Sequence, residues 1–179
     1  KSLDDDSHIS IEHLKNVLNL DHHNIADKTI YLFLNPDDHK KIPTSEMLSI
    51  KRLDNSYADA FKKFTSDCSR EDLKKGLVQI DDPVVYGCFD DNKLIGAASY
   101  WFWGEKIADI GVVVHPEFRQ RGVAKSLVAK LCEWGIENKK INLYRHNERN
   151  TTSHKLAYSL NFKTHIVSSD MSLQGLGVR

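Results

Sequence analysis

The sequence lacks the features that mark several classes of protein. Its basic and acidic residues balance at 25 each, so there is no overall basic excess to attract nucleic acid or an anionic membrane. Its longest apolar stretch, from Leu94 to Trp103, is interrupted by Gly96 and Ser99 and has about half the length needed to span a bilayer. We therefore expect neither a nucleic-acid partner nor a membrane partner.

Cysteine is also scarce. Cys68, Cys88 and Cys132 are odd in number, lie far apart and form no CxxC pair, a pattern typical of free thiols in a reducing compartment. Residues 1–10 contain an acidic run and no hydrophobic signal region. These observations predict a cytoplasmic protein whose cysteines are small core residues.

Ordered metal-ligand spacing is a third feature that the sequence lacks. The histidines gathered near the start of the chain stand without the regular Cys or carboxylate partners of a metal site. They are His8, His13, His22 and His23. We expect them to be surface residues, and we expect no metal.

With 179 residues, 40% of them apolar, the chain is long enough for one domain with a sizeable core. The sequence pattern changes near residue 45. Before it, apolar residues from Ile11 to Leu18 recur at helical spacing after Ser10, and Thr29–Leu34 is a short β-branched and aromatic run. We therefore expect a helix and strand appendage in residues 1–45, followed by a domain in residues 46–179.

Residues 46–179 alternate between strand-like and helix-like segments. Strands are expected at 47–53, 84–89, 94–103, 107–114, 141–146 and 162–167, and helices around 57–64, after Ser69, at 122–138 and at 150–160. The strands at 107–114 and 141–146 are joined by a helical crossover and are expected to be parallel, whereas the preceding strands form an antiparallel meander. The fold class is mixed α/β, with a mostly antiparallel sheet flanked by helices.

The segment after the strand at 107–114 carries the strongest chemical signal. A Pro turn leads into RxxGxA, formed by Arg119, Gly122 and Ala124, at the start of a long amphipathic helix. Backbone N–H groups at a helix start lack internal partners and favour anions. Small residues let a pyrophosphate approach the backbone, and Arg119 and Arg121 add positive charge.

This segment resembles the acetyl-CoA binding motif of the GNAT superfamily of N-acetyltransferases, (R/Q)xxGx(G/A) after the fourth strand. The downstream segment resembles the family pattern NxxAxxLYxxxGF, with Asn161 where Gly is usual. The matching residues are Asn150, Ser153, Leu156, Leu160, Asn161 and Phe162. The resemblance covers Met47 to about Val167.

The resemblance implies a GNAT fold whose sheet splays between its fourth and fifth strands, with acetyl-CoA as co-substrate in the gap. Gly111 fits a bulge that would create the splay, and a freed backbone N–H near Val112 or Val113 would bind the thioester oxygen. The implied cofactor-binding residues are Val112, Val113, Val114, Arg119, Gln120, Arg121, Gly122, Val123, Ala124, Lys125, Asn150 and Ser153.

Acetyl transfer to an amine benefits from a base, because an aliphatic ammonium has a pKa of about 10.4. Asp109 occupies the strand position where the family often carries a catalytic Glu, so the resemblance implies that it is the base. The alternative is an Asp at an exposed edge or paired with an arginine. Glu105, in the preceding turn, is the reserve candidate.

The family's usual general acid is a tyrosine, and here its position holds Ala157. Tyr158 is adjacent, but one residue along a helix is about 100° of rotation, so we expect it to point elsewhere. Tyr144 and His146 share a face of the neighbouring strand and are alternatives. The candidate catalytic residues are therefore Asp109, Tyr144 and Tyr158, with Tyr158 not expected to be the main acid.

The four aromatic residues at 100–103 alternate between the two faces of one strand. We expect them to be mostly core, with one face as an alternative wall of an acceptor pocket.

The resulting hypothesis is an N-acetyltransferase that moves an acetyl group from acetyl-CoA to a primary amine in a direct ternary complex. A catalytically silent GNAT domain that binds acyl-CoA as a sensor or scaffold is one alternative. A protein N-terminal or lysine acetyltransferase is another. The acceptor is a small-molecule amine or a peptide, and a homodimer stays an open alternative for the assembly.

Overall fold

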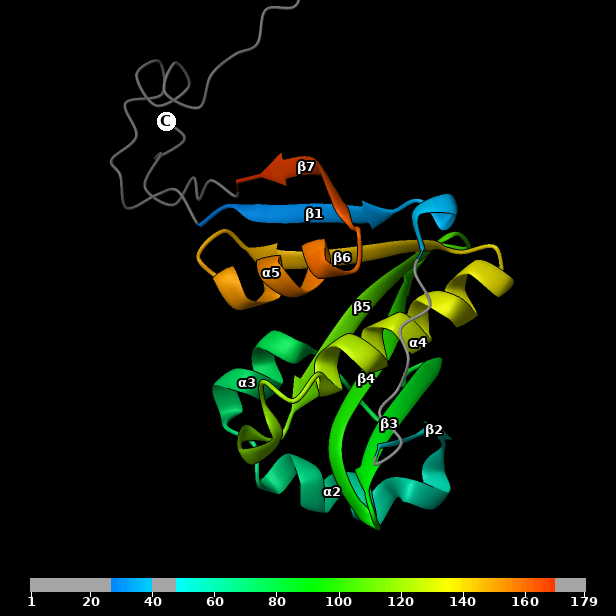
Figure 1. Ribbon diagram of the computed structural model, residues 1–179, viewed down its shortest axis with the longest axis vertical. Helices are drawn as coiled ribbons and strands as arrows, with labels where there is room; N and C mark the ends of the chain where they lie inside the picture. Colours follow the sequence, from blue (N-terminus) through cyan, green and yellow to red (C-terminus); the bar gives the residue numbers. More distant parts are fainter. Residues whose placement is uncertain (1–26, 40–47, 170–179) are drawn as a thin grey trace, which may run out of the picture.

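The computed structural model describes residues 27–39 and 48–169 as one seven-stranded mixed sheet covered by helices (Figure 1). The strands are β1 (Thr29–Leu34), β2 (Ser49–Leu53), β3 (Val84–Asp90), β4 (Lys93–Trp103), β5 (Ile107–Val114), β6 (Ile141–Asn147) and β7 (Lys163–Ser168). The helices are α2 (Ala58–Ser66), α3 (Arg70–Gly76), α4 (Val123–Glu137) and α5 (Thr151–Ser159), with short 3-10 turns at Pro36–Asp38, Asn55–Tyr57 and Pro116–Phe118. The expected elements within these residues form, with ends that differ by one or two positions. The helix expected near Ile11 and the N-terminal histidines lie outside the described residues.

The strand order is β2-β3-β4-β5-β6-β1-β7. Strands β5 and β6 pair in parallel, as the helical crossover predicts, and the other pairs are antiparallel. The mixed α/β fold with a mostly antiparallel sheet is therefore confirmed. No helix in the described part of the chain is long and apolar enough to cross a membrane.

Strand β1 is not set apart from this sheet. It lies between β6 and β7 and pairs with both, and Leu32 and Leu34 are buried in the main core. The expected strand therefore forms at Thr29–Leu34, but as an interior strand of the sheet rather than a peripheral one. Residues 40–47 lie outside the described residues, so the boundary near residue 45 stays a prediction.

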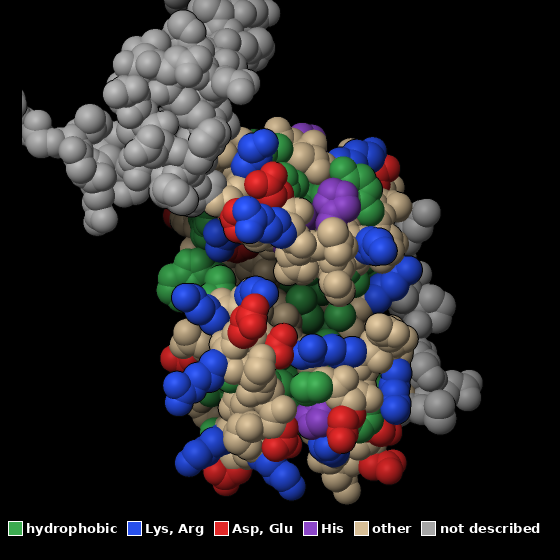
Figure 2. All heavy atoms as spheres, turned by 90° about the vertical axis from the view of Figure 1, so that its left-hand side faces the viewer, with side chains coloured by type: hydrophobic (Ala, Val, Ile, Leu, Met, Phe, Trp, Pro, Cys, Tyr) green, Lys and Arg blue, Asp and Glu red, His purple; other side chains and the backbone are tan. Residues whose placement is uncertain are grey.

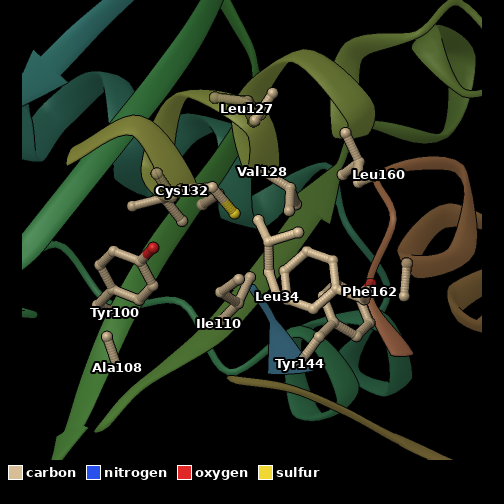
Figure 3. Packing of buried hydrophobic residues seen from close by; sticks show 14 of the residues in the cluster. Leu34, Tyr100, Ala108, Ile110, Leu127, Val128, Cys132, Tyr144, Leu160 and Phe162 are labelled. Atoms are coloured by element: carbon tan, nitrogen blue, oxygen red, sulfur yellow. The ribbon is translucent and has the colours of Figure 1, made fainter. Parts of the chain in front are cut away.

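Two apolar layers hold the helices to the sheet. On one face, α4 packs against β3 to β6, and Figure 3 shows Leu127, Val128 and Cys132 of this helix lying over Tyr100 and Ile110. On the other face, Phe61 and Phe64 of α2 pack in a second cluster with Val113 of β5. Burying each of these large side chains stabilises the fold by about 1.5–3 kcal/mol.

Local sequence signals explain where the short helices begin. Ser69 caps α3 by accepting a hydrogen bond from the Asp72 amide, as the Ser-x-x-Asp spacing predicts. Helix α3 ends at Gly76, and the next residue, Leu77, adopts a left-handed backbone with φ 51°. Leu77 follows Leu73 of the apolar face by four residues, but the left-handed turn leaves its side chain 59% exposed.

Gly111 serves close packing rather than a bulge. The β4–β5 ladder runs without a register shift from Gly96↔Val114 to Trp103↔Ile107, so the expected bulge is absent from it. A Cβ at Gly111 would overlap the carbonyl oxygen of Gly76, and a Cβ at Gly76 would overlap β5. The two glycines thus let the end of α3 cross β5 at backbone contact distance.

Candidate active site

A cleft opens where β5 and β6 part. Their ladder ends at Ile110↔Tyr144, although both strands continue, and Figure 1 shows β5 running away from β6. The cleft has a volume of about 1390 Å³. Figure 2 shows a hollow across this side of the molecule, with hydrophobic side chains inside and basic side chains along its rim.

The direction of the peptide groups in β5 follows from one hydrogen bond. The His115 N–H donates to the Ile95 carbonyl of β4 at 2.9 Å. Peptide groups alternate in direction along a strand, so every second residue counted from His115 also faces β4. The peptide groups of Val112 and Val114 then point to the other edge of β5, where β6 no longer pairs with it. Of the two residues expected to offer a free N–H, Val112 rather than Val113 has its peptide on the cleft side.

The start of α4 lines one end of the cleft. Gly122 precedes the helix with φ +80°, and no side chain of the described residues caps the first turn. The amides of Val123, Ala124 and Lys125 belong to this turn, since the first helical bond runs from the Ser126 N–H to the Gly122 carbonyl at 3.0 Å. Unpaired amides and the positive end of the helix dipole therefore face this end of the cleft.

Basic side chains surround this helix start. The Arg119 guanidinium pairs with Asp72 of α3 at 2.9 Å and donates from Nε to the Val114 carbonyl at 3.3 Å. Arg121 lies with its guanidinium 5.0 Å from the centre of the Phe118 ring. Arg119 borders the cleft and Arg121 does not.

The expected cofactor-binding residues therefore come together, with Arg121 as the exception. Val112–Val114, Arg119, Gln120, Gly122, Val123, Ala124, Lys125, Asn150 and Ser153 all line the cleft. The Asn150 side chain accepts a hydrogen bond from the Ser153 amide at 3.0 Å, so it caps α5.

Asp109 lies in the same cleft, on the sheet face that α3 partly covers. It is only 5% exposed, and its Oδ2 accepts a hydrogen bond from Arg145 Nε at 2.8 Å. The same oxygen lies 2.6 Å from Arg145 Nη2 in an ion pair. Burial raises the pKa of Asp109, and the hydrogen bonds and charge of Arg145 oppose that rise. Asp109 thus has the arginine partner considered as the alternative, and it also borders the cleft with a raised pKa.

The tyrosine candidates separate. Tyr144 is buried, lines the cleft and has a pKa raised by burial, which a hydrogen bond with Ser153 opposes. Tyr158 lies outside the cleft, with its hydroxyl 3.0 Å from Thr164 Oγ1. Ala157, at the position of the family's tyrosine, is fully buried. Tyr158 therefore points away from the cleft, as its 100° offset from Ala157 along the helix predicts, whereas Asp109 and Tyr144 line the cleft.

His146 also reaches the cleft and belongs to a polar chain. Its Nδ1 lies 2.8 Å from the Asn147 carbonyl, and its Nε2 lies 3.2 Å from His154 Nδ1. With both ring nitrogens engaged within the protein, His146 is placed to orient its neighbours. Glu105, the reserve base, lies in the turn between β4 and β5 and does not line the cleft.

Two tryptophans that we expected to be mostly core line the cleft instead. Trp101 is 63% exposed and Trp103 is 40% exposed, whereas Tyr100 and Phe102 of the same strand face α4. The alternation of residues 100–103 between the two faces of the sheet was visible in the sequence. The sequence did not show that α2 and α3 leave this end of one face uncovered.

In the described residues, no group of three or more His, Cys, Asp or Glu side chains is arranged to hold a metal ion. Cys88 and Cys132 are buried and Cys68 is partly buried.

Comparison with known proteins agrees with this architecture. The family model described as "Acetyltransferase (GNAT) family" matches residues 50–162. No curated protein matches the chain. A putative GNAT acetyltransferase from Novosphingobium aromaticivorans superposes with a TM-score of 0.60 at 16% identity, covering 83% of this chain and 66% of that one. A GNAT acetyltransferase from Colwellia psychrerythraea gives 0.61 at 18% identity, covering 88% and 62%.

An aminoglycoside N-acetyltransferase AAC(6')-Iy, solved in complex with CoA, superposes with a TM-score of 0.53 at 23% identity, covering 70% of this chain and 95% of that one. At these identities the structural likeness concerns the fold. The chain spans less than two thirds of the length of the Novosphingobium and Colwellia structures. The family match covers more than half of the chain, and the protein therefore belongs to the GNAT acetyltransferase family.

Proposed function

We propose that the protein transfers an acetyl group from acetyl-CoA to a primary amine within a direct ternary complex. The observation that carries the proposal is that one cleft joins the unpaired amides of α4, the Val112 peptide and the Asp109 carboxylate. The amides suit the pyrophosphate of the donor, the Val112 peptide suits the thioester carbonyl, and the carboxylate suits the ammonium of the acceptor.

The residues present fit acetyl-CoA. The first turn of α4, with Arg119 and Lys125 beside it, would hold the pyrophosphate, and Asn150 with Ser153 would contact the pantetheine arm. Gly122 leaves open space where a side chain would otherwise stand, because a Cβ built there meets no atom within 4 Å. Bound acetyl-CoA supplies the activated acyl group.

The chain's own groups would then manage charge and protons. Asp109 accepts a proton from the ammonium, directly or through water, and its raised pKa brings it closer to neutral pH than an ordinary carboxylate. The Val112 N–H donates to the carbonyl oxygen as negative charge develops on it. A thiol has an ordinary pKa of about 8.5, so the departing sulfur can take its proton from solvent, and Tyr144, which lines the cleft, is the candidate acid.

A catalytically silent, CoA-binding domain is the second candidate, favoured by Ala157 at the position of the family's tyrosine acid. Both candidates predict CoA binding, so binding alone does not separate them. The test is acceptor-dependent release of free thiol from acetyl-CoA with a panel of amines, antibiotics and peptides, which also separates small-molecule from protein acetylation.

Asp109→Asn provides the decisive variant once an acceptor is found. We expect kcat to fall by roughly 10²- to 10⁴-fold with CoA affinity unchanged, because the base is lost while the anion site is intact. Asp91→Asn, in the β3–β4 turn outside the cleft, is the matched control. A near-wild-type rate and pH profile for Asp109→Asn would return this residue to a purely structural role.

A further inference from the structure

The exposed large hydrophobic side chains of the described residues are unevenly distributed. Seven are exposed, and three of them, Leu77, Trp101 and Trp103, line the cleft. Exposed apolar side chains gathered in a concave site are typical of ligand contacts. These three define what we call the apolar wall.

Two features show that the apolar wall is built into the fold. Leu77 holds a left-handed backbone at the end of α3, where Gly or Asn is common, and this conformation exposes its side chain in the cleft. Trp101 is paired with Asp109 across the β4–β5 ladder, so the indole and the carboxylate start side by side on the same sheet face. The wall therefore stands next to the proposed base.

The charged groups beside the wall are mostly neutralised already. Asp109 pairs with Arg145 at 2.6 Å, and Asp27 pairs with Arg149 at 2.8 Å. Asp82 is different, because its Oδ2 accepts from the Gln79 amide at 2.8 Å and from the Ser99 hydroxyl at 2.5 Å. Among the described residues no basic side chain lies within 4.0 Å of the Asp82 carboxylate, so this carboxylate has hydrogen-bond donors but no ion-pair partner there.

Asp82 is also close to the wall. Ser99, its hydroxyl partner, precedes Trp101 by two residues on the same face of β4, and a strand advances about 3.4 Å per residue. Within residues 27–39 and 48–169, this end of the cleft thus offers one carboxylate without an ion-pair partner, beside an aromatic surface. These residues do not supply the several unpaired carboxylates that a polycation would need, and Arg145 and Arg149 would repel additional positive charges.

We propose that the acceptor is a monoamine carried on a flat apolar group, an arylalkylamine, whose ring stacks on Trp101 and whose ammonium is attracted by Asp82 and delivered to Asp109. This inference rests on the proposed function, because it assigns the acceptor half of the same cleft. Arg145 already lies over Trp103, 4.9 Å from the ring centroid. Trp101 is thus the indole left for a ligand, whereas Trp103 helps to fix the ion pair with Asp109.

Binding is measured by calorimetry on the full chain saturated with CoA, with four probes. They are 2-phenylethylamine, n-butylamine as the same amine without a ring, and spermidine and kanamycin as polycations. We expect 2-phenylethylamine to bind at least tenfold more tightly than the other three. Tighter binding of a polycation, or equal binding of n-butylamine, would overturn the proposal.

Variants then locate the contact. Trp101→Ala should weaken 2-phenylethylamine at least tenfold and leave n-butylamine unchanged, Trp101→Phe should restore most of the loss, and Asp82→Asn should weaken both amines. Ile166→Ala, which removes an exposed hydrophobic side chain from β7 outside the cleft, is the matched control. Unchanged affinity in Trp101→Ala would overturn the proposal.

The same probes are assayed for acetylation with acetyl-CoA, so that the two ideas can fail separately. Trp101-dependent binding of 2-phenylethylamine without any acetyl transfer would support the acceptor class and contradict the enzymatic function. Acetylation of kanamycin or spermidine in preference to 2-phenylethylamine would support the enzymatic function and overturn the acceptor class.

Discussion

Asp109 illustrates how burial and a partner compete at a single carboxyl group. Burial disfavours the charged form, whereas the Arg145 guanidinium favours it, and the pKa of Asp109 remains raised as the result. An aspartate whose negative charge is fully balanced by a cation would be a weak base. A buried Asp without a cation beside it would keep its proton. Arg145 is in this sense a positioning residue that keeps the carboxylate available.

Arg145→Gln tests this balance. Without the guanidinium the pKa of Asp109 should rise further, because burial is then unopposed. Since the base is active only when ionised, activity is lost as pH falls through this pKa, and the acid limb of the kcat/KM profile should move to higher pH. Arg145→Lys, which keeps the positive charge, should move it less. A profile that is unchanged in Arg145→Gln would show that Asp109 does not set the acid limb.

Tyr158 provides a test with the opposite expectation. Its hydroxyl contacts Thr164 outside the cleft, so Tyr158→Phe should retain kcat within about tenfold, equivalent to about 1.4 kcal/mol of barrier. Tyr144→Phe is the informative comparison, because Tyr144 lines the cleft. Turnover of both variants with one acceptor measures the difference. A loss of several hundredfold in Tyr158→Phe, with CoA affinity unchanged, would assign the acid role to Tyr158.

At the scale of elements, the start of α4 combines sequence and geometry most directly. The backbone turns through Gln120 at φ 61° and Gly122 at φ 80° before the helix begins, which presents the first amides to the cleft. The RxxGxA spacing was sufficient to predict that this turn and helix start form the proposed anion site, and both line the cleft. The Arg119–Asp72 ion pair was not visible in the sequence, because it joins two helices that only the tertiary fold brings together.

Gly122→Glu should abolish CoA binding, because it adds a carboxylate where phosphate is expected to lie. Gly104→Glu is the matched control, since Gly104 also has a positive φ, also has open space around its Cβ position and lies outside the cleft. Both variants place a glutamate at a positive φ, so calorimetry with CoA separates the charge effect at the cleft from the general effect of such a substitution. Equal CoA affinity in the two variants would contradict the proposed anion site.

Periodicity predicted most elements correctly because their apolar faces are regular. The Ser153, Leu156, Ala157 and Leu160 set, for example, places Ala157 and Leu160 in the core. Gly111 was misinterpreted for a physical reason. A glycine in a strand is compatible with a bulge or with a close backbone approach, and only the position of the α3 terminus distinguishes the two.

At the scale of the molecule, the sequence predicted the fold class but not the position of its first described strand. Thr29–Leu34 has the composition of a strand, yet nothing local indicates that its partners are β6 and β7. Strand pairing is decided by which faces and edges remain unfilled, and this information lies in the whole sheet. The exposure of Trp101 was not predicted for the same reason, because whether helices cover this part of the sheet decides how exposed the side chain is.

A chain that begins at residue 48 tests the role of β1. Its removal leaves β7 without its strand partner and takes Leu32 and Leu34 out of the core. Losing a buried leucine typically costs 2–5 kcal/mol, and a whole domain has about 5–15 kcal/mol of stability, so the shortened chain should lose its cooperative thermal transition. Circular dichroism provides the measurement, with a chain beginning at residue 27 as control. Equal melting temperatures would make β1 dispensable.

The interior position of β1 also constrains how the protein is made. The hydrogen bond between Asn147 and Asp27, at one end of the β1–β6 pair, joins residues 120 positions apart. On the ribosome, the strand that emerges early must wait for almost the entire domain to be synthesised before its neighbours exist. Such high contact order slows folding and leaves an apolar strand exposed in the nascent chain. While the residues between β1 and β6 are being synthesised, β1 has no strand partner. Protection of the nascent chain by a chaperone is therefore most valuable during that interval.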